Sequence, residues 1–518
     1  MSSLSDGYTS GNRQRLWRVL PAASRDEPAQ DVGLDRRAFL KLLSASLAGL
    51  TACSRPPREE IVPFVHPPLQ PRAQAFYASA LVRGGCAHGV LVRNDMGRPT
   101  KIEGNPQHPT SQGATDAIMQ AAVLELWDPD RSRSVRERGR IATWDAALGE
   151  FAHWRETLRD NGGAGLRVLS GAFSSPTLKA QRARLLARYP KARWHVHEPI
   201  ALDAALTGAD LVFGTPLAPR YRFARARTVL ALDADFLSCP HSGLRHARDF
   251  ATARRVSTET PPLRLYAIEG TPTLTGMMAD HRWPLASRKV EGVARELARR
   301  LGVDAGPGET HDVPAAWIDA AVHDLSANRG ASLIVAGYAQ PPSVHALAYL
   351  MNRALGNLGT TLTFGDPVVD TDSFGELLDD LRRGAVDSLL VLDANPAYTA
   401  PAGSDFAELL ARVPRSVHCG LYFDETARNC VWHVPEAHAL EQWSDACADD
   451  GTASIVQPLI APLYEGRSPH TLIAALAGEA ELDPYTIVRA HWRERFGDKF
   501  DTRWDAALRS GIDAGTAT

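Results

Sequence analysis

The sequence predicts an α/β fold with mostly parallel β-sheets, and two observations indicate it. From about residue 163 onward, short apolar runs alternate with longer stretches of helical pattern, which is typical of a parallel sheet covered by helices on both faces. Gly, Asp and Asn residues follow several of the apolar runs, where tight turns from strand to helix need them. A β-hairpin and a shaped loop are predicted ahead of this alternating part.

The N-terminal elements are predicted within residues 84–159. Apolar runs on either side of a Gly-containing turn predict the hairpin, and Pro106 and Pro109 make the segment after it an irregular loop. Two helical patterns follow, of which the second carries Trp144, Phe151 and Trp154 near one face. The predicted strands are 90–92 and 100–103, with a turn at 95–97, and the predicted helices are 114–127 and 144–159.

The alternating part supplies the parallel strands and their covering helices. Ligands in such sheets bind at the carboxyl ends of the strands, so the residues just after each strand are candidate binding residues. The predicted strands are 166–170, 211–214, 228–232, 263–268, 333–336, 389–392 and 417–421. The predicted helices are 175–189, 290–301, 315–327, 343–355 and 374–383.

Five loops after predicted strands carry Gly, Asp, Asn or Glu. Their backbone N–H groups and carboxylates could meet a nucleotide-like ligand, or they could serve only the tight turns. The sequence contains neither G-x-G-x-x-G nor the P-loop pattern, which favours the second interpretation. The loops are Gly214-Thr215-Pro216, Asp233-Ala234-Asp235, residues 269–273, residues 337–340 and residues 393–396.

Length and composition describe a large soluble chain. Its 518 residues are enough for two or three domains, and its 23% charged and 44% hydrophobic residues are ordinary for globular proteins. The formal net charge of -3 gives no basis for a nucleic-acid partner.

The first 53 residues form a predicted export signal. Arg36 and Arg37 precede the apolar run 42–52, which is too short to cross a bilayer, since a span needs roughly 20 apolar residues. The arginine pair resembles a twin-arginine signal, and residues 50–53 resemble a lipobox with Cys53 as the acylated residue. These features imply a folded, exported protein, lipid-anchored on the periplasmic face of a membrane. Residues 54–73 are proline-rich and predict an extended tether.

The hairpin and its loop resemble the N-terminal segment of the molybdopterin oxidoreductases of the dimethyl-sulfoxide-reductase type. The motif consists of Glu103, Gly104, Asn105, Pro106, His108 and Pro109. In that family the loop lies beside an iron–sulfur cluster held by four cysteines. Here only Cys86 remains, and residues 113–116 stand where the fourth cysteine would be. One thiolate cannot hold a four-iron cluster.

The later loops resemble the molybdopterin-like half of the large iron–sulfur subunit of alternative complex III. The segments ALDADFLSCP, DANPAYTAPA and residues 432–468 carry this likeness, which extends from Leu16 to about Ile512. The resemblance implies an N-terminal hairpin segment at 74–135, Rossmann-like α/β domains at 136–510 and a tail at 511–518. The sequence stops before the family's C-terminal β-barrel cap and its cysteine-dense ferredoxin region.

The resemblance also implies the protein's setting and its cofactors. Alternative complex III is a membrane quinol:electron-acceptor oxidoreductase, so the expected partners are a ferredoxin-like iron–sulfur subunit, a membrane quinol-binding subunit and cytochrome c subunits. No cofactor is expected in this chain, whereas iron–sulfur clusters and haem are expected on the partners. The first hypothesis is therefore a non-catalytic scaffold subunit. The alternatives are an active molybdopterin oxidoreductase completed by a partner iron–sulfur chain, and a lipoprotein that uses the fold for unrelated ligands.

The remaining reactive residues have structural as well as functional interpretations. None of the six cysteines forms C-x-x-C, and Cys419 and Cys430 are either buried thiols or a disulfide. His418, His433 and His438, with Glu436 and Glu441, could form a metal site or, more simply, a polar network.

No residue is nominated as catalytic, cofactor-binding or metal-binding, and no molybdenum ligand is identified. Residues 280–282 and 449–452 are polar enough to line a cleft or to form turns. Trp127, Trp432 and Trp443 are interpreted as core or docking residues.

Overall fold

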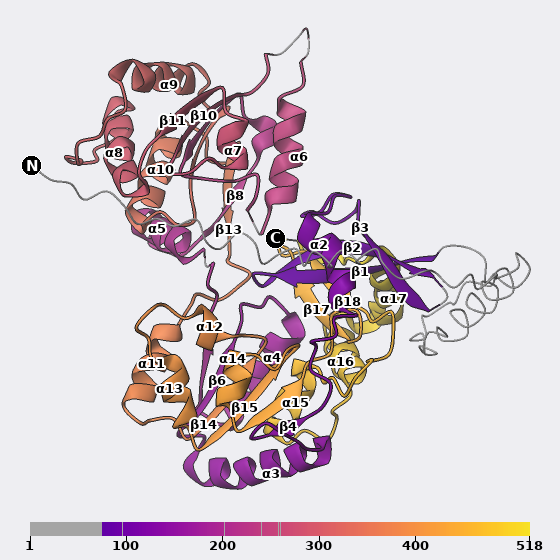
Figure 1. Ribbon diagram of the computed structural model, residues 1–518. Coiled ribbons are helices and arrows are strands. Elements are labelled where there is room, and N and C mark those ends of the chain that lie inside the picture. The colour runs from indigo at the N-terminus through magenta and orange to yellow at the C-terminus, as the bar shows by residue number, and fades with distance from the viewer. Residues whose placement is uncertain are drawn as a thin grey trace, which may run out of the picture. The chain divides into compact units, whose positions relative to one another are not determined.

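Two sheets of parallel strands form the centre of the structure, a computed structural model (Figure 1). It describes residues 75–517 except residues 96, 201, 240, 257, 259 and 260. The predicted export signal at Arg36 and Arg37, the predicted lipidation site Cys53 and the tether at 54–73 lie outside the described residues. Among the helices that are described, none has the length and apolar character needed to span a bilayer.

The smaller sheet has four strands, all parallel to their neighbours, in the order β11-β10-β9-β12. Strands β9 and β12 are fully buried and mostly apolar, and hydrophobic layers cover both faces of the sheet. The strands are β9 (Thr228–Leu232), β10 (Arg264–Glu269), β11 (His281–Pro284) and β12 (Ser332–Ala336). The helices around them are α5 (Asp203–Phe213), α6 (Gly243–Ala253), α7 (Leu274–Met277), α8 (Val290–Arg300), α9 (Ala315–Ala327) and α10 (Pro342–Ala354). A two-stranded ladder, β8 (Ala218–Tyr221) with β13 (Leu362–Gly365), is antiparallel.

The larger sheet has seven strands in the order β5-β4-β16-β15-β14-β6-β7. The five strands from β16 to β7 are parallel, and the short edge strands β4 and β5 are antiparallel. The strands are β4 (Arg136–Glu137), β5 (Arg140–Ile141), β6 (Leu166–Ser170), β7 (Arg193–Val196), β14 (Ser388–Leu392), β15 (Arg415–Gly420) and β16 (Trp432–Pro435).

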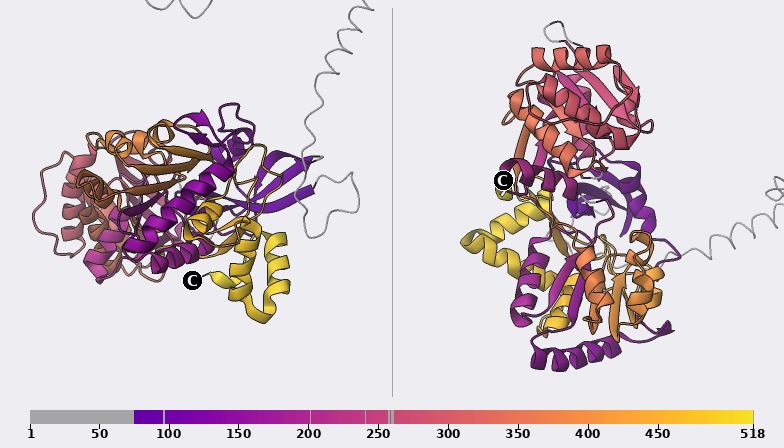
Figure 2. Two further views of the ribbon diagram at one scale, coloured as in Figure 1. Left: turned by 90° about the horizontal axis from the view of Figure 1, so that it is seen from below. Right: turned by 90° about the vertical axis from the view of Figure 1, so that its left-hand side faces the viewer.

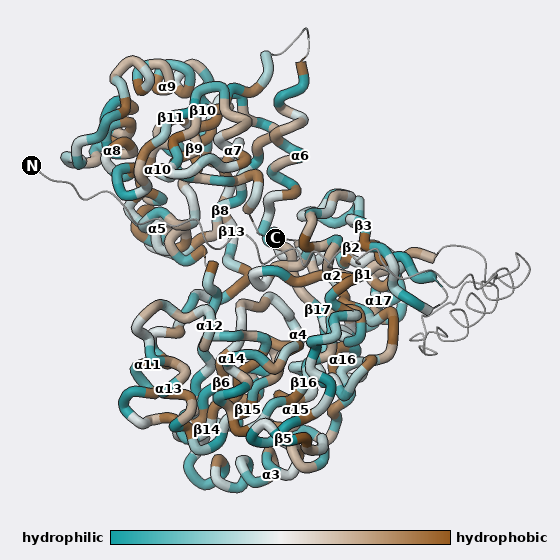
Figure 3. Tube along the Cα trace, viewed as in Figure 1, coloured by the Kyte–Doolittle hydropathy of each residue, from teal (hydrophilic) through white to brown (hydrophobic). Residues whose placement is uncertain are grey.

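Helices pack against both faces of this larger sheet (Figure 2). The outermost helix, α3, buries Ala147, Phe151, Trp154 and Leu158 and is hydrophilic on its outer side (Figure 3). One face carries α3 (Trp144–Asn161), α4 (Pro176–Arg188) and α15 (Pro469–Ala477), and the other α11 (Phe374–Arg382) and α13 (Phe406–Ala411). The short helices α12 (Pro396–Thr399) and α14 (Glu425–Asn429) follow β14 and β15.

The two ends of the described chain pack together. Strand β1 contacts β18 and helix α17, and the Gln457 amide donates to the carbonyls of Ala78 and Leu508. The N-terminal elements are β1 (Ala75–Arg83), β2 (Cys86–Asp95), β3 (Arg98–Gly104) and α2 (Ala117–Glu125). The C-terminal elements are β17 (Ser444–Cys447), β18 (Ala453–Val456), α16 (Pro484–Phe496) and α17 (Phe500–Ser510). Four short 3₁₀ helices are also described: 223–225, 287–289, 497–499 and 514–516.

The predicted α/β class with mostly parallel sheets is confirmed, and one predicted strand is wrong. Residues 211–213 are the last turn of α5, and Gly214 follows them with φ 72° as the left-handed cap of that helix. The run of apolar residues imitates a strand, but Leu211 is exposed, so the run is not the buried strand that was predicted. The first strand of the N-terminal sheet, β1, was not predicted.

Candidate functional site

Strand β9 of the smaller sheet and strand β14 of the larger sheet both lead into the tripeptide Leu-Asp-Ala, whose leucine is the last residue of the strand. Asp233 follows β9 and Asp393 follows β14, and both have left-handed backbone angles, with φ 52° and 46°. Residues other than glycine seldom adopt this conformation, and it concentrates at functional sites. A cavity opens at the carboxyl end of each sheet, as expected for parallel α/β sheets.

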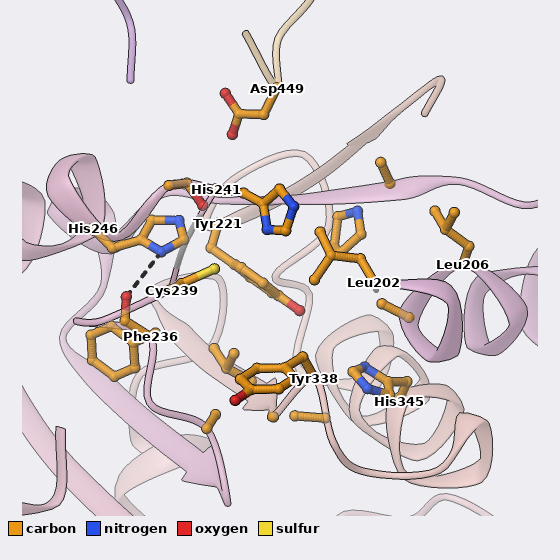
Figure 4. A pocket seen from close by; sticks show the side chains of 18 of the residues that line it. Leu202, Leu206, Tyr221, Phe236, Cys239, His241, His246, Tyr338, His345 and Asp449 are labelled. Atoms are coloured by element: carbon orange, nitrogen blue, oxygen red, sulfur yellow. Dashed lines mark hydrogen bonds between the residues drawn. The ribbon is translucent and has the colours of Figure 1, made fainter. Parts of the chain in front are cut away.

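The cavity at the end of the four-stranded sheet is small and mostly apolar (Figure 4). Its volume is about 120 Å³, and Tyr221, His241, Tyr338 and His345 surround it together with aliphatic residues. Burial lowers the pKa of His345 to about 4. The ring is therefore neutral at physiological pH, and the cavity suits an uncharged group.

Two thiols line this first cavity, Cys86 from β2 and Cys239 from the loop after β9. They are 153 positions apart in the sequence, so their spacing gave no sign that they meet. Burial raises the pKa of both thiols, and Cys447, whose pKa is raised to about 11, belongs to the same surroundings. These groups are therefore protonated thiols in the structure described here.

The second cavity, at the end of the seven-stranded sheet, is larger and acidic. It has a volume of about 490 Å³, and both Asp393 and Glu436 line it. The backbone N–H of Asp393 donates to Cys419 O at 2.9 Å, and that of Glu436 donates to Gly420 O at 2.9 Å. Because Cys419 and Gly420 end β15, the two acids flank this strand from opposite sides.

The environment disfavours the ionised form of both acids. Asp393 is open to the cavity yet enclosed by protein, and this desolvation, followed by the charges of Glu125 and Glu198, raises its pKa to about 6. Burial, followed by the charge of Asp393, raises the pKa of Glu436 well above its usual value. The two carboxyl groups thus oppose each other's ionisation.

Most other ionisable groups of this acidic cavity have partners. Arg83 pairs with Asp116, and His438 Nε2 lies 3.4 Å from Glu125 Oε2. The carboxylate of Asp445 accepts four hydrogen bonds, from Ser175 Oγ, from the N–H and Oγ of Thr177, and from Trp492 Nε1. Among the described residues that line the cavity, no positively charged side chain is left over to neutralise Asp393 and Glu436.

This set of residues does not fit a molybdopterin cofactor. Such a cofactor carries phosphate, which would face two carboxyl groups, and the described residues that line the cavity include no free Arg or Lys to offset its charge. The hydroxyl groups that could ligate a metal are committed elsewhere, because Ser174 Oγ bonds to the backbone of Cys447 and Ser175 Oγ bonds to Asp445.

The family-motif loop is tied down by its own polar atoms. Asn105 is buried, its carbonyl accepts from His108 N, Gly113 N and Ser111 Oγ, and its Nδ2 donates to Ser510 O at 2.6 Å. His108 is also buried and its Nδ1 lies 2.8 Å from Thr110 Oγ1. Gly104, between Glu103 and Asn105, contacts Ala114 so closely that a side chain would clash. Pro106 and Pro109 complete this loop, which connects β3 to α2 and is hydrogen-bonded to the end of α17 through Asn105.

The other predicted candidates are placed in local networks. His418 Nδ1 lies 3.0 Å from His433 Nδ1, and His433 Nε2 lies 2.7 Å from Ser132 Oγ. Arg131 and Glu441, each about 1% exposed, form a two-pronged ion pair. The described residues contain no group of three His, Cys, Asp or Glu that could hold a metal ion.

Of the two interpretations of Cys419 and Cys430, the buried thiols are observed, because both cysteines are free and buried. The strand-end loops of the smaller sheet serve their own turns. Asp235 accepts from the N–H and Oγ of Thr275, and Glu269 accepts from Thr273 and Arg282.

Of the polar residues predicted at 280–282 and 449–452, Asp449 lines the apolar cavity and pairs with Arg245. Asp280 and Arg282 pair with Arg254 and Glu269. The three tryptophans pack as structural residues: Trp127 lies under Arg98, Trp432 is buried in β16, and Trp443 stacks on Trp504.

Sequence reasoning identified Asp393 and Glu436 separately and missed that they share a cavity. Asp393 was assigned to a strand-end loop and Glu436 to the histidine cluster. The missing signal was β16, the short strand 432–435 that places Glu436 beside the end of β15.

Two comparisons with known proteins give relatives of this chain, while no family model matches it. The chain is 25% identical over 527 aligned residues to the menaquinone reductase molybdopterin-binding-like subunit of Nitratidesulfovibrio vulgaris, covering 87% of this chain and 73% of that protein. Its fold is similar to acetylene hydratase from Pelobacter acetylenicus, with a TM-score of 0.62 and 15% identity over 77% of this chain and 69% of that one.

Proposed function

The chain belongs to the molybdopterin oxidoreductase family, and from this premise we propose that it is a subunit of a quinol-linked electron-transfer complex. Its role in that complex is that of a scaffold, similar to the molybdopterin-like half in alternative complex III. Partner subunits then carry the electrons. These are the ferredoxin-like iron–sulfur subunit, the membrane quinol-binding subunit and the cytochrome c subunits.

The observation that carries this proposal is the likeness to a menaquinone reductase subunit over 87% of the chain. Two features of the residues agree with a scaffold. Cys86 is the one cysteine of the hairpin segment, and one thiolate cannot hold a four-iron cluster. The described residues that line the acidic cavity include no free cation for phosphate. The absence of a resident molybdenum cofactor is part of the proposal.

The location is also part of the proposal. Arg36 and Arg37 would direct export, and an acyl chain at Cys53 would hold the protein on the periplasmic face of the membrane. Changing both arginines to lysine should leave the protein in the cytoplasm. Changing Cys53 to Ala should allow export but release the protein from the membrane fraction. If the Cys53→Ala protein instead stays membrane-bound, and does so only while its partner subunits are present, the partner subunits are the anchor.

The test is purification of the tagged native protein from its own membranes, with its subunits and metals quantified. We expect iron- and haem-bearing subunits to co-purify and molybdenum to stay far below one atom per chain. A monomer without such partners would overturn the scaffold proposal. The family relationship also supplies a second candidate, an active molybdopterin oxidoreductase completed by an iron–sulfur chain. Stoichiometric molybdenum would support this second candidate instead.

A further inference from the structure

The acidic cavity has a surplus of carboxyl groups that the described residues do not offset. Arg83 and His438, which line it, already face Asp116 and Glu125. Arg131, the nearby arginine that lowers the pKa of Glu436, is held by Glu441. Asp393 and Glu436 therefore remain without a positive partner among the described residues.

Glu436 has an unsatisfied atom in addition to lacking a positive partner among the described residues. Its side chain belongs to a residue only 7% exposed, and its Oε2 atom has no hydrogen-bond partner among the described residues. A buried carboxyl oxygen without a donor is costly. Since Glu436 lines the cavity, a ligand with N–H donors would remove that cost.

The walls beside the two acids are apolar. Phe173 from the loop after β6 and Leu421 from the end of β15 line the same cavity. Val82 on β1 and Ile118 on α2 also line it, and they are 45% and 62% exposed. Apolar side chains this accessible next to a charged site suit the hydrocarbon stem of a ligand.

From this geometry we propose that the cavity binds an organic cation of the guanidinium or alkylammonium class. Its charged end lies between Asp393 and Glu436, and its stem packs on Val82, Ile118 and Phe173. A planar guanidinium presents paired N–H donors that match a carboxylate. A metal ion suits the site less, because such ions need more ligands and the described residues offer no group of three.

The test uses the purified full chain and n-butylguanidinium as the probe, with binding followed by calorimetry and by thermal shift. We expect saturable binding and a raised melting temperature. The neutral isostere n-butylurea has a similar planar shape and N–H donors but no charge. It should bind about tenfold more weakly or not at all, because hydrogen bonds to an ionised partner are roughly twice as strong.

Two variants assign the site. Glu436→Gln and Asp393→Asn should each weaken binding of the cation about tenfold, because each removes one charge-assisted contact. Asparagine tolerates the left-handed backbone of position 393, so Asp393→Asn should keep the fold. It therefore still tests the site if the buried substitution Glu436→Gln prevents folding. Glu408→Gln on α13, an exposed acid away from the cavity, is the matched control and should bind with unchanged affinity.

Three results would overturn the proposal. The cation could fail to bind at millimolar concentration, it could bind the folded Asp393 and Glu436 variants as tightly as the unmodified protein, or n-butylurea could bind equally well. None of these results bears on the subunits that co-purify with the native protein, so this proposal and the scaffold proposal fail separately.

Discussion

The ends of the two parallel sheets are built alike but differ in charge. The strand orders β11-β10-β9-β12 and β16-β15-β14-β6 correspond, and β9 and β14 both lead into Leu-Asp-Ala. Two residues further on, Asp235 accepts from the N–H and hydroxyl of Thr275, and Asn395 accepts from the same two groups of Thr426. The same local sequence therefore gives the same backbone and the same clamp on the next helix.

The residues after the neighbouring strands make the difference. Asp233 accepts from Gly270 N at 3.2 Å, Ser287 Oγ at 2.5 Å and Gln340 Nε2 at 2.8 Å. Ser287 comes shortly after β11, whereas Glu436 comes directly after the corresponding strand β16. One aspartate thus meets hydrogen-bond donors and the other meets a second acid. The neighbouring residues, more than the Leu-Asp-Ala turn itself, therefore decide whether such an acid is structural or available to a ligand.

The largest predicted effect comes from removing the positive partner of Glu441, a buried acid near the acidic cavity that is paired with Arg131. In Arg131→Met, Glu441 keeps its burial but loses its partner, so the free energy of unfolding should fall by about 3–5 kcal/mol. Denaturant unfolding measures this loss. The double variant with Glu441→Gln should recover part of it, because no charge then remains unpaired. A loss below about 1 kcal/mol in the single variant would contradict the prediction.

A smaller effect is predicted at the satisfied aspartate. Asp233→Asn keeps the left-handed backbone but turns an N–H₂ group toward Ser287 or Gln340, so stability should fall by about 1–2 kcal/mol. The same substitution at Asp393 serves as the control and should not destabilise the protein. Equal losses at the two positions, measured by denaturant unfolding, would remove the distinction between the two sheet ends.

The smallest effect is a gain in stability, and it depends on pH. The pKa of Asp393 is raised from 3.8 to about 6 in the folded protein, so between these values the folded state holds more protons than the unfolded state. Stability from this group therefore falls as pH rises through that range and stays low above it. Glu125, Glu198 and Glu436 are the acids that face it.

Asp393→Asn removes this penalty, so its melting temperature at pH 7.5 should exceed that of the unmodified protein by about 1–2 °C. The gain should disappear as pH falls below the unfolded-state pKa of 3.8, because the carboxyl group is then neutral in both states. A gain that is equal at all pH values would show that charge is not its cause. Scanning calorimetry across this range makes the measurement.

Much of the fold follows from short stretches of sequence. Periodicity located β6, β9 and α9 at their observed bounds, because an apolar run or an amphipathic repeat is complete within a few residues. It failed at residues 211–213, where apolar residues end a helix. Only half of the candidate site could be predicted from the sequence. Asp393 was identified because it follows a predicted strand. The four-residue strand β16 has too short an apolar pattern to be predicted, so Glu436 could not be placed.

By itself, then, the sequence determined the alternation of strands and helices, the Leu-Asp-Ala strand ends and the reduction of the family's cysteine run to Cys86. The tertiary structure alone decided which charges are paired. Arg131 meets Glu441 across 310 positions, and Asp393 and Glu436 meet only because both flank β15. Backbone conformation is set by neighbours in the chain, whereas charge pairing and desolvation depend on residues that folding brings together.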